Sequence, residues 1–218
     1  MELPKIKDSY NYENNFYLSC NTQRIGKFLA HYELFKMSSN IPGSIIECGI
    51  FKGNSLIRFA SFKKLGISKS KKIIGFDMFG KFPETKFEKD QKMRKKFIKD
   101  AGLNSISKKQ LTQIMKRKKL NEKMELIEGD ITKTIPTYLE KNPKLKISFL
   151  NLDTDIYEPA VTILENLYPR ITKGGILVLD DYGVFPGETK AVNEYFAKKK
   201  IEIKKFPFSK TPHYIIKK

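Results

Sequence analysis

At 218 residues, 40% of them hydrophobic, the chain is long enough for one domain with a full-sized core and too apolar to be a disordered segment. The sequence has no apolar run long enough to cross a bilayer, and its polar N-terminus lacks the apolar stretch of a secretory signal. Its two cysteines stand outside any CxxC pair, which disfavours a disulfide framework. We therefore expect a cytoplasmic protein in which residues 1–218 form a single domain.

The formal net charge of +18 raises the question of a nucleic-acid partner. Only five of the 42 basic residues are arginine, the side chain that binds phosphates and base edges best. We therefore interpret most of the lysines as a solvated surface and disfavour nucleic acid as a partner. The same positive field would help an acidic or phosphorylated small molecule to bind.

The first 40 residues are expected to form a helical lead-in, because apolar residues recur at helical spacing over 21–37. A short buried strand is expected over 44–50, followed by a glycine-containing turn and a helix that ends at Gly66. A second buried strand is expected over 71–79.

Residues 85–120 interrupt this alternation with a polar, basic segment that has helical spacing. Ser107 and Gln110 have the spacing of a capping box at the start of its second helix. We expect a solvated helical insertion. Because it follows the C-terminal end of the second strand directly, it is also a candidate lid over a ligand crevice.

Three more buried strands are expected along the chain, over 123–130, 146–154 and 175–182. A helix between the last two is expected to end at Gly174 and Gly175. The tail is expected to close the sheet as an antiparallel hairpin of 201–208 and 213–218. Apolar strands alternating with helices predict an α/β fold, with a mostly parallel, seven-stranded sheet covered on both faces. Five parallel strands and a closing hairpin are the order of the Rossmann-like class I methyltransferase fold.

Acidic side chains follow every strand of the expected parallel sheet. They are Glu47, Asp77, Glu128, Asp130, Asp153, Asp155, Asp180 and Asp181. In an open parallel sheet, ligands bind outside the carboxyl ends of the strands. Since the chain as a whole carries +18, this concentration of acid predicts a functional site at that edge.

The loop after the first strand contains Glu47, Gly49 and Gly53 in the pattern E-x-G-x-x-x-G. A dinucleotide site has a closer glycine pair, and a glutamate there would repel a pyrophosphate. A cationic cofactor without phosphate, such as S-adenosylmethionine, fits better. Asp77 is then expected at the ribose hydroxyls and Asp130 near the adenine. The alternative is an ordinary strand–helix turn, with Glu47 satisfied by a helix N-terminus.

Asp153 is expected beside Asp180 and Asp181, because the fourth and fifth strands should be neighbours. Carboxylates crowded together repel one another unless a cation lies between them. An all-oxygen site without nearby His or Cys favours Mg²⁺ or Mn²⁺. Asp155 is expected to act as the general base, although capping of the following helix would also explain it. His31 is expected to be a packed or surface residue.

Four segments together resemble the macrocin O-methyltransferase (TylF-like) family: "IIECGIFKGNS", "GFDMFGKFPE", "LNLDTDIYEPAVTILENLYPRITKGGILVLDDYG" and "GETKAVNEYF". The resemblance spans roughly residues 25–196 and implies a metal-dependent sugar O-methyltransferase. It implies Asp153, Asp180 and Asp181 as Mg²⁺ ligands and Asp155 as the general base. The cofactor pocket that it implies consists of Glu47, Gly49, Gly53, Ser55, Asp77 and Asp130. We add Asn54 and Asp153 to the predicted cofactor-binding residues.

The resemblance further implies a small-molecule sugar acceptor, such as a deoxysugar that is nucleotide-linked or belongs to a glycan. A homodimer is the commonest assembly for a soluble enzyme. Three alternatives remain open: an RNA methyltransferase that uses the basic surface, a catechol-type O-methyltransferase, and a non-catalytic protein that keeps only the cofactor pocket.

Overall fold

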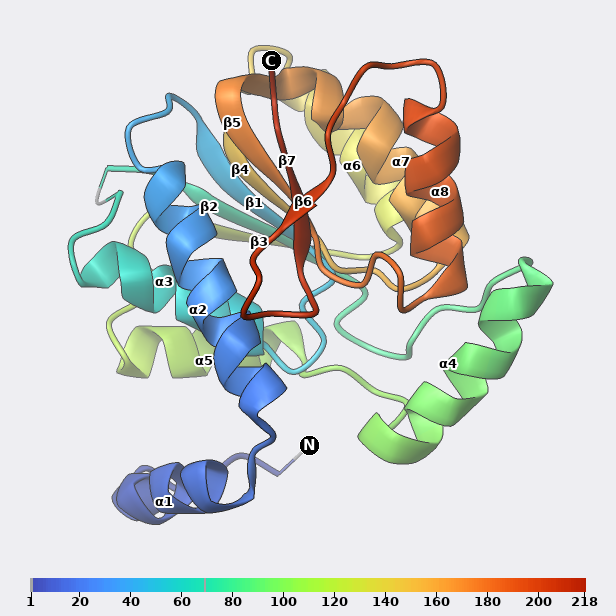
Figure 1. Ribbon diagram of the computed structural model, residues 1–218. Coiled ribbons are helices and arrows are strands. Elements are labelled where there is room, and N and C mark those ends of the chain that lie inside the picture. The colour runs from blue at the N-terminus through green and yellow to red at the C-terminus, as the bar shows by residue number, and fades with distance from the viewer. Residues whose placement is uncertain (1, 69) are drawn as a thin grey trace.

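The computed structural model describes residues 2–68 and 70–218, and these residues contain a seven-stranded sheet with the order β3-β2-β1-β4-β5-β7-β6 (Figure 1). The strands are β1 Ser44–Cys48, β2 Ile73–Asp77, β3 Met124–Glu128, β4 Ile147–Leu152, β5 Ile171–Leu179, β6 Lys204–Lys205 and β7 His213–Ile216. The first five strands pair in parallel, whereas β7 runs antiparallel to both β5 and β6. The predicted α/β class, strand order and closing hairpin are confirmed.

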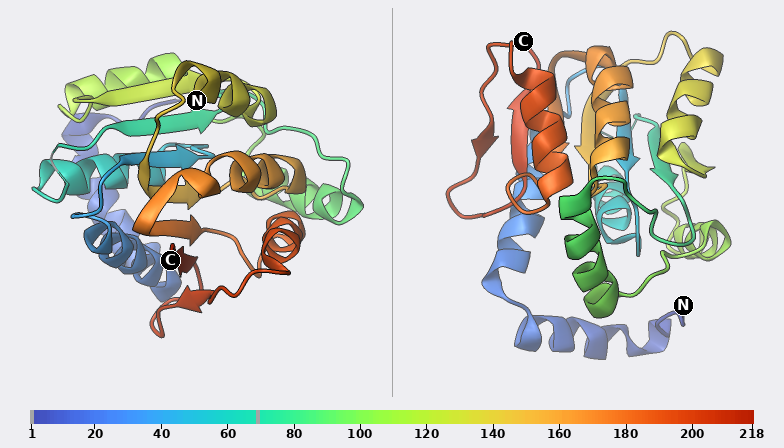
Figure 2. Two further views of the ribbon diagram at one scale, coloured as in Figure 1. Left: turned by 90° about the horizontal axis from the view of Figure 1, so that it is seen from above. Right: turned by 90° about the vertical axis from the view of Figure 1, so that its right-hand side faces the viewer.

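The helices lie on both faces of the sheet, as the two views of Figure 2 show. They are η1 Ile6–Asp8, α1 Ser9–Ser19, α2 Thr22–Met37, α3 Asn54–Lys64, α4 Glu88–Ala101, α5 Lys108–Arg117, α6 Ile131–Lys141, α7 Tyr157–Asn166, η2 Tyr168–Arg170 and α8 Pro186–Phe196. None of the described helices is long and apolar enough to span a membrane.

Two apolar cores cover the sheet because successive strand side chains point to opposite faces. Ile46 packs with α6, α7 and α8 on one face, whereas its neighbour Ile45 packs with α2, α3 and α5 on the other. Both side chains are fully buried. Burial on both sides explains why the strands are continuously apolar, as a parallel sheet requires.

Gly174 and Gly175 lie inside β5, so the prediction that they end the preceding helix was wrong. Helix α7 ends earlier, at Asn166. The N–H of Gly174 instead donates to the carbonyl of Lys217 at 2.8 Å, and the residue has a φ of 82°. This left-handed conformation at a register shift between β4 and β5 is one that glycine adopts without strain.

Backbone hydrogen bonds hold the carboxyl ends of neighbouring strands level with one another. The N–H of Gly49 donates to Phe76, that of Asp153 to Cys48, and that of Asp180 to Leu152, over 2.9–3.0 Å. These bonds continue the parallel ladder one residue past each strand. The acidic residues that follow the strands therefore lie along one edge of the sheet.

The 85–120 insertion contains two helices, α4 and α5, and α5 begins with the predicted Ser107–Gln110 capping box. Helix α4 projects away from the sheet toward α8 (Figure 1). Its first turn is fastened to α7 and α8, because the buried carboxylate of Asp90 accepts the N–H of Tyr157 at 2.9 Å and that of Gly187 at 2.7 Å. One aspartate thus satisfies orphan donors at the start of both α7 and α8.

Candidate active site

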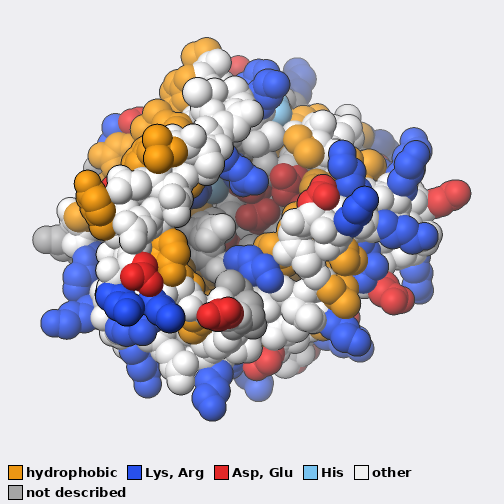
Figure 3. Space-filling model, turned by 90° about the horizontal axis from the view of Figure 1, so that it is seen from below, with side chains coloured by type: hydrophobic (Ala, Val, Ile, Leu, Met, Phe, Trp, Pro, Cys, Tyr) orange, Lys and Arg blue, Asp and Glu red, His pale blue; other side chains and the backbone are white. Residues whose placement is uncertain are grey.

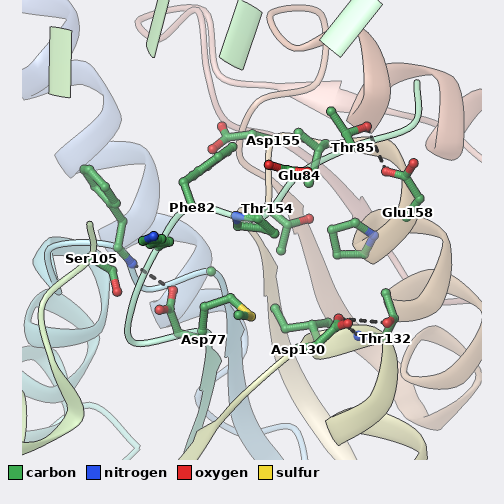
Figure 4. Close-up of a pocket in the computed structure, with 18 of the residues that line it drawn as sticks. Asp77, Phe82, Glu84, Thr85, Ser105, Asp130, Thr132, Thr154, Asp155 and Glu158 are labelled. Atoms are coloured by element: carbon green, nitrogen blue, oxygen red, sulfur yellow. Dashed lines mark hydrogen bonds between the residues drawn. The ribbon is translucent and has the colours of Figure 1, made fainter. Parts of the chain in front are cut away.

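A cavity of about 490 Å³ opens at the carboxyl ends of β1, β2, β3 and β4. Figure 4 shows Asp77 and Asp130 at one end of it and Asp155 toward the other. The stretch from Met78 to Lys86, which leads into the insertion, forms one wall. The predicted site residues that line the cavity are Gly49, Asp77, Asp130, Asp153 and Asp155.

Asp77 shapes the loops around this cavity. Its Oδ2 accepts the N–H groups of Ile50 and Phe51 at 2.8 and 3.1 Å, and its Oδ1 accepts that of Phe79 at 2.6 Å. Phe51 and Phe79 have positive φ angles of 47° and 50°, a conformation that the carboxylate stabilises by holding both N–H groups. An ionised carboxylate has about four acceptor positions, so capacity remains for a ligand hydroxyl.

Gly49 lies where the loop after β1 meets the loop after β4. Its φ is 90°, and a Cβ at this position would lie 1.7 Å from the carbonyl oxygen of Asp153. No side chain fits in that space. The glycine loop and the loop that carries the aspartates are therefore in direct backbone contact.

Four of the predicted cofactor residues lie behind the cavity wall and outside the described lining: Glu47, Gly53, Asn54 and Ser55. Gly53 caps α3 with a φ of 86°, and Asn54 begins that helix. The hydroxyl of Ser55 donates to the fully buried carboxyl of Glu47. Burial raises the pKa of Glu47 to about 8, against the opposing effect of the Ser55 hydrogen bond. The bond between Ser55 and Glu47 thus connects the start of α3 to β1, on either side of the loop that contains Gly49.

Asp130 is the N-cap of α6. Its Oδ1 accepts two hydrogen bonds from Thr132, one from the N–H at 2.9 Å and one from the hydroxyl at 2.7 Å. The residue also lines the cavity. The capping bonds fix its side chain, and its expected contact with adenine stays a prediction.

Asp153, Asp155 and Asp181 form a compact group, with one oxygen of each carboxylate within 4.8 Å of the others. Figure 3 shows acidic side chains at the bottom of a hollow surrounded by lysine and arginine. Burial, followed by the charge of Asp180, raises the pKa of Asp153 well above its usual range. Burial and the neighbouring Asp181 do the same for the pKa of Asp155. A cation stabilises such a group of carboxylates, and carboxylate oxygens are the hard donors that suit Mg²⁺ or Mn²⁺.

Asp155 does not cap α7, so the alternative explanation for this residue was wrong. The N-cap is Ile156, and the first N–H of the helix donates to the remote Asp90 instead. Asp155 has a φ of 64°, and its carbonyl accepts the N–H of Glu188 at 3.2 Å. This left-handed conformation is uncommon outside glycine and places the carboxylate beside Asp181.

Asp180 is fully buried and lies outside the three-carboxylate group. Its Oδ1 accepts a hydrogen bond from Nε2 of His31 at 2.8 Å, and its Oδ2 forms an ion pair with the ammonium of Lys27. Although burial opposes ionisation, Lys27 and His31 hold the pKa of Asp180 well below its usual range. Although burial opposes it, the negative charges of Asp180, Asp153 and Asp181 raise the pKa of Lys27 well above its usual range.

The tautomer of His31 follows from its second partner. Arg58 donates from Nη1 to Nδ1 of His31 at 2.7 Å, and a guanidinium has only donors. Nδ1 therefore accepts, and Nε2 carries the hydrogen that is donated to Asp180. Burial lowers the pKa of His31, which agrees with a neutral ring. Of the two predicted environments for His31, packed or surface, the structure shows the packed one, and its partner was not foreseen.

Glu188 of α8 is a further acidic residue that the sequence analysis missed. It is fully buried, and its Oε1 accepts the N–H of Asp181 at 3.1 Å. Its Oε2 has no hydrogen-bond partner among the residues that the structure describes. Burial, followed by Asp181, raises the pKa of Glu188 well above its usual range.

The sequence contained a weak signal for the basic partners of Asp180. Lys27 and His31 are four residues apart in α2, and residues at this spacing share one helix face. Their distance from Asp180 along the chain hid the contact.

Comparison with known proteins gives relatives that act as O-methyltransferases. Demethyldecarbamoylnovobiocin O-methyltransferase from Streptomyces niveus is 26% identical over 166 residues, which are 74% of this chain and 61% of that protein. Mycinamicin III 3''-O-methyltransferase from Micromonospora griseorubida is 25% identical over 77% of this chain and 65% of its own. The chain thus spans less than two thirds of the length of these curated relatives.

Among solved structures, the calicheamicin methyltransferase CalS11 has the same fold with a TM-score of 0.76, at 23% identity over 99% of this chain and 86% of its own. The O-methyltransferase NovP gives 0.74 at 23% identity, over 87% of this chain and 78% of its own. The sequence pattern of the macrocin-O-methyltransferase (TylF) family matches residues 21–209, which include the glycine loop and the acidic group. The chain therefore belongs to the macrocin-O-methyltransferase (TylF) family.

Proposed function

We propose that this protein is an S-adenosylmethionine-dependent, Mg²⁺-dependent O-methyltransferase that acts on a hydroxyl of a sugar. The observation that carries the proposal is the single cavity that joins Asp77 and Asp130 to the carboxylates of Asp153 and Asp155. A donor site and an acidic, metal-type site that share one cavity can place a methyl group next to an oxygen nucleophile.

Carboxylate oxygens are hard donors that fit a divalent ion such as Mg²⁺. Asp153, Asp180 and Asp181 would hold the ion: Asp153 and Asp181 lie close together, and Asp180 already pairs with a cation, the ammonium of Lys27. The bound ion would stabilise negative charge on the acceptor oxygen, and S-adenosylmethionine would supply the methyl group. Asp155, buried beside Asp181, would take the proton of the acceptor hydroxyl.

Asp77 would accept hydrogen bonds from the cofactor ribose with the acceptor capacity that its backbone bonds leave free. Asp130 would lie at the adenine end of the cavity. Glu47, Gly53, Asn54 and Ser55 would act indirectly, by supporting the loop that contains Gly49.

The acceptor class is proposed from the relatives. One of them, from Streptomyces olivaceus, is a 4'-O-methyltransferase of a rhamnosyl-tetracenomycin; it is 25% identical over 68% of this chain and 56% of its own length. A deoxysugar that is nucleotide-linked or belongs to a glycan is therefore the proposed partner. We further propose that residues 1–218 act as one methyltransferase domain, with 1–40 as a helical lead-in and 85–120 as a lid.

Titration calorimetry with S-adenosylmethionine tests the donor site, and transfer of a labelled methyl group to a panel of free and nucleotide-linked deoxysugars tests the reaction. We expect cofactor binding, turnover on at least one sugar, loss of turnover in EDTA and recovery with Mg²⁺. Absence of cofactor binding at millimolar concentration would refute the proposal. Full turnover in EDTA would refute the metal dependence.

A further inference from the structure

The ammonium of Lys27 contacts the carboxylate oxygen of Asp180 that does not bond to His31. Oδ1 of Asp180 accepts the hydrogen bond of His31, whereas Oδ2 contacts the ammonium of Lys27. Asp153 and Asp181 add their attraction for the same ammonium. One monovalent side chain thus compensates part of the negative charge of the residues that are proposed to hold a divalent ion.

Asp180 cannot turn to offer a different oxygen. Its side chain is 1% exposed, and His31 is held in turn by Arg58 at 2.7 Å. The ring of His31 also packs against Phe59, with the ring centroids 5.2 Å apart. Oδ2 is therefore the oxygen that a second cation would have to share with Lys27.

Lys27 has a way out of the site that Asp180 lacks. Its side chain is 24% exposed, and a lysine stem of four carbons can swing its ammonium from a buried contact into solvent. The residue lies in the second turn of α2.

We propose that Lys27 is an internal counter-cation of the proposed metal ligands Asp153, Asp180 and Asp181, and that it competes with the divalent metal for Oδ2 of Asp180 and so sets the metal affinity of the site. Two cations cannot share one buried carboxylate oxygen without strong repulsion. Metal binding therefore displaces Lys27, and the lost ion pair weakens the apparent affinity. The inference rests on the proposed function, because the metal is the ligand of that same site.

Without the ammonium, the carboxylates would be left uncompensated in the absence of metal. Removing one partner of a buried ion pair is strongly destabilising, whereas a ligand that binds only the folded state restores stability. Lys27→Met keeps the length and apolar stem of the side chain while removing the charge. Its metal-free form should unfold at a lower temperature than the wild type and gain more from Mg²⁺.

The decisive measurement is the affinity for Mn²⁺ alone, followed by electron paramagnetic resonance or calorimetry on the full chain. We expect Lys27→Met to bind Mn²⁺ roughly tenfold more tightly than the wild type, within the range typical of coupling between two binding events. Lys27→Arg, which keeps the charge, should stay near the wild type. Lys36→Met is the matched control, because Lys36 lies in the same helix but pairs with the exposed Glu33.

Equal or weaker Mn²⁺ affinity in a folded Lys27→Met, alongside clear binding by the wild type, overturns the inference and leaves the metal-dependent function standing. Absence of Mn²⁺ binding in both proteins overturns the two together. A measurement on the wild type covers the case in which the variant does not fold: reductive methylation of Lys27, read by mass spectrometry, should be faster with Mg²⁺ present. An unchanged rate for a Mg²⁺-loaded protein counts against displacement.

Discussion

Asp155 combines an unusual backbone conformation with a buried carboxyl group, and this combination makes it testable. At a φ of 64°, asparagine is tolerated nearly as well as aspartate, so Asp155→Asn removes the proposed base and keeps the turn. We expect turnover to fall by about 10²–10⁴-fold, the range typical of a lost general base. Cofactor affinity from calorimetry should stay unchanged, and undiminished turnover would exclude Asp155 from this role.

Glu47 predicts a specific pH dependence of stability. Burial raises its pKa from 4.5 in the unfolded chain to about 8 in the folded protein. Between these two values the folded state binds the extra proton, so this group's contribution to stability is complete below about pH 4.5 and is lost as the pH rises through 8. The loss is on the order of a few kcal/mol, given about 1.4 kcal/mol per pH unit.

Glu47→Gln cannot ionise and escapes this loss. In EDTA, the free energy of unfolding of Glu47→Gln minus that of the wild type should increase between pH 5.5 and 8.5, as measured by urea denaturation. Ser55 can still donate to the glutamine carbonyl, so the loop keeps its support. A constant difference across this pH range would show that Glu47 is already ionised in the fold.

Single residues differ in how far the sequence revealed them. Asp153 and Asp181 could be placed together because each follows a strand of a parallel sheet. The ion pair of Asp180 with Lys27 could not, because it depends on where α2 packs rather than on any local pattern. Asp77 was expected to bind a ribose, and its backbone contacts emerged only from the structure.

At the scale of elements, the N-termini of α7 and α8 depend on one side chain from α4. Asp90→Ala leaves the N–H groups of Tyr157 and Gly187 without their acceptor. We expect the free energy of unfolding to fall by about 2 kcal/mol, as for the loss of charged caps and buried hydrogen bonds. Asp100→Ala is the control, because Asp100 is exposed in the last turn of the same helix. Equal effects of the two changes in chemical denaturation would contradict the bridging role.

The same elements show where local sequence patterns fail. The Ser107–Gln110 capping box was predictable because both partners lie in one turn. The cap from Asp90 joins residues 67 positions apart and has no local signal. Two consecutive glycines, normally a sign of a helix end, became residues of β5 because backbone partners in the tail were available.

At the scale of the molecule, the charge of +18 contrasts with an acidic hollow. A positive field accelerates binding of anions and is screened by salt. If the acceptor is nucleotide-linked, its KM should rise several-fold between roughly 0.05 and 0.5 M salt. The KM of a neutral sugar should change little under the same conditions. Parallel salt dependence for both acceptors would show that the field plays no role in acceptor binding.

The whole fold was largely predictable, because five apolar strands alternating with helices admit few topologies. The sequence did not show which apolar side chains of the lead-in are buried and which are exposed. Exposed aromatic and aliphatic side chains gather on the lead-in, including Tyr10, Phe16, Tyr17 and Leu18 of α1. Their spacing alone could not show that α1 lies away from the sheet (Figure 1).

The backbone contact between Gly49 and the carbonyl of Asp153 has a consequence for how acceptor preference can change. This contact limits how closely the loop that contains Gly49 approaches the loop that carries Asp153, so substitutions of side chains that do not hold these two loops leave that separation unaltered. Under the proposed function, residues 78–86 could therefore diversify to admit differently shaped sugars without changing the distance between these two loops. Exchanging Gly49 for any larger residue would, by contrast, push the two loops apart.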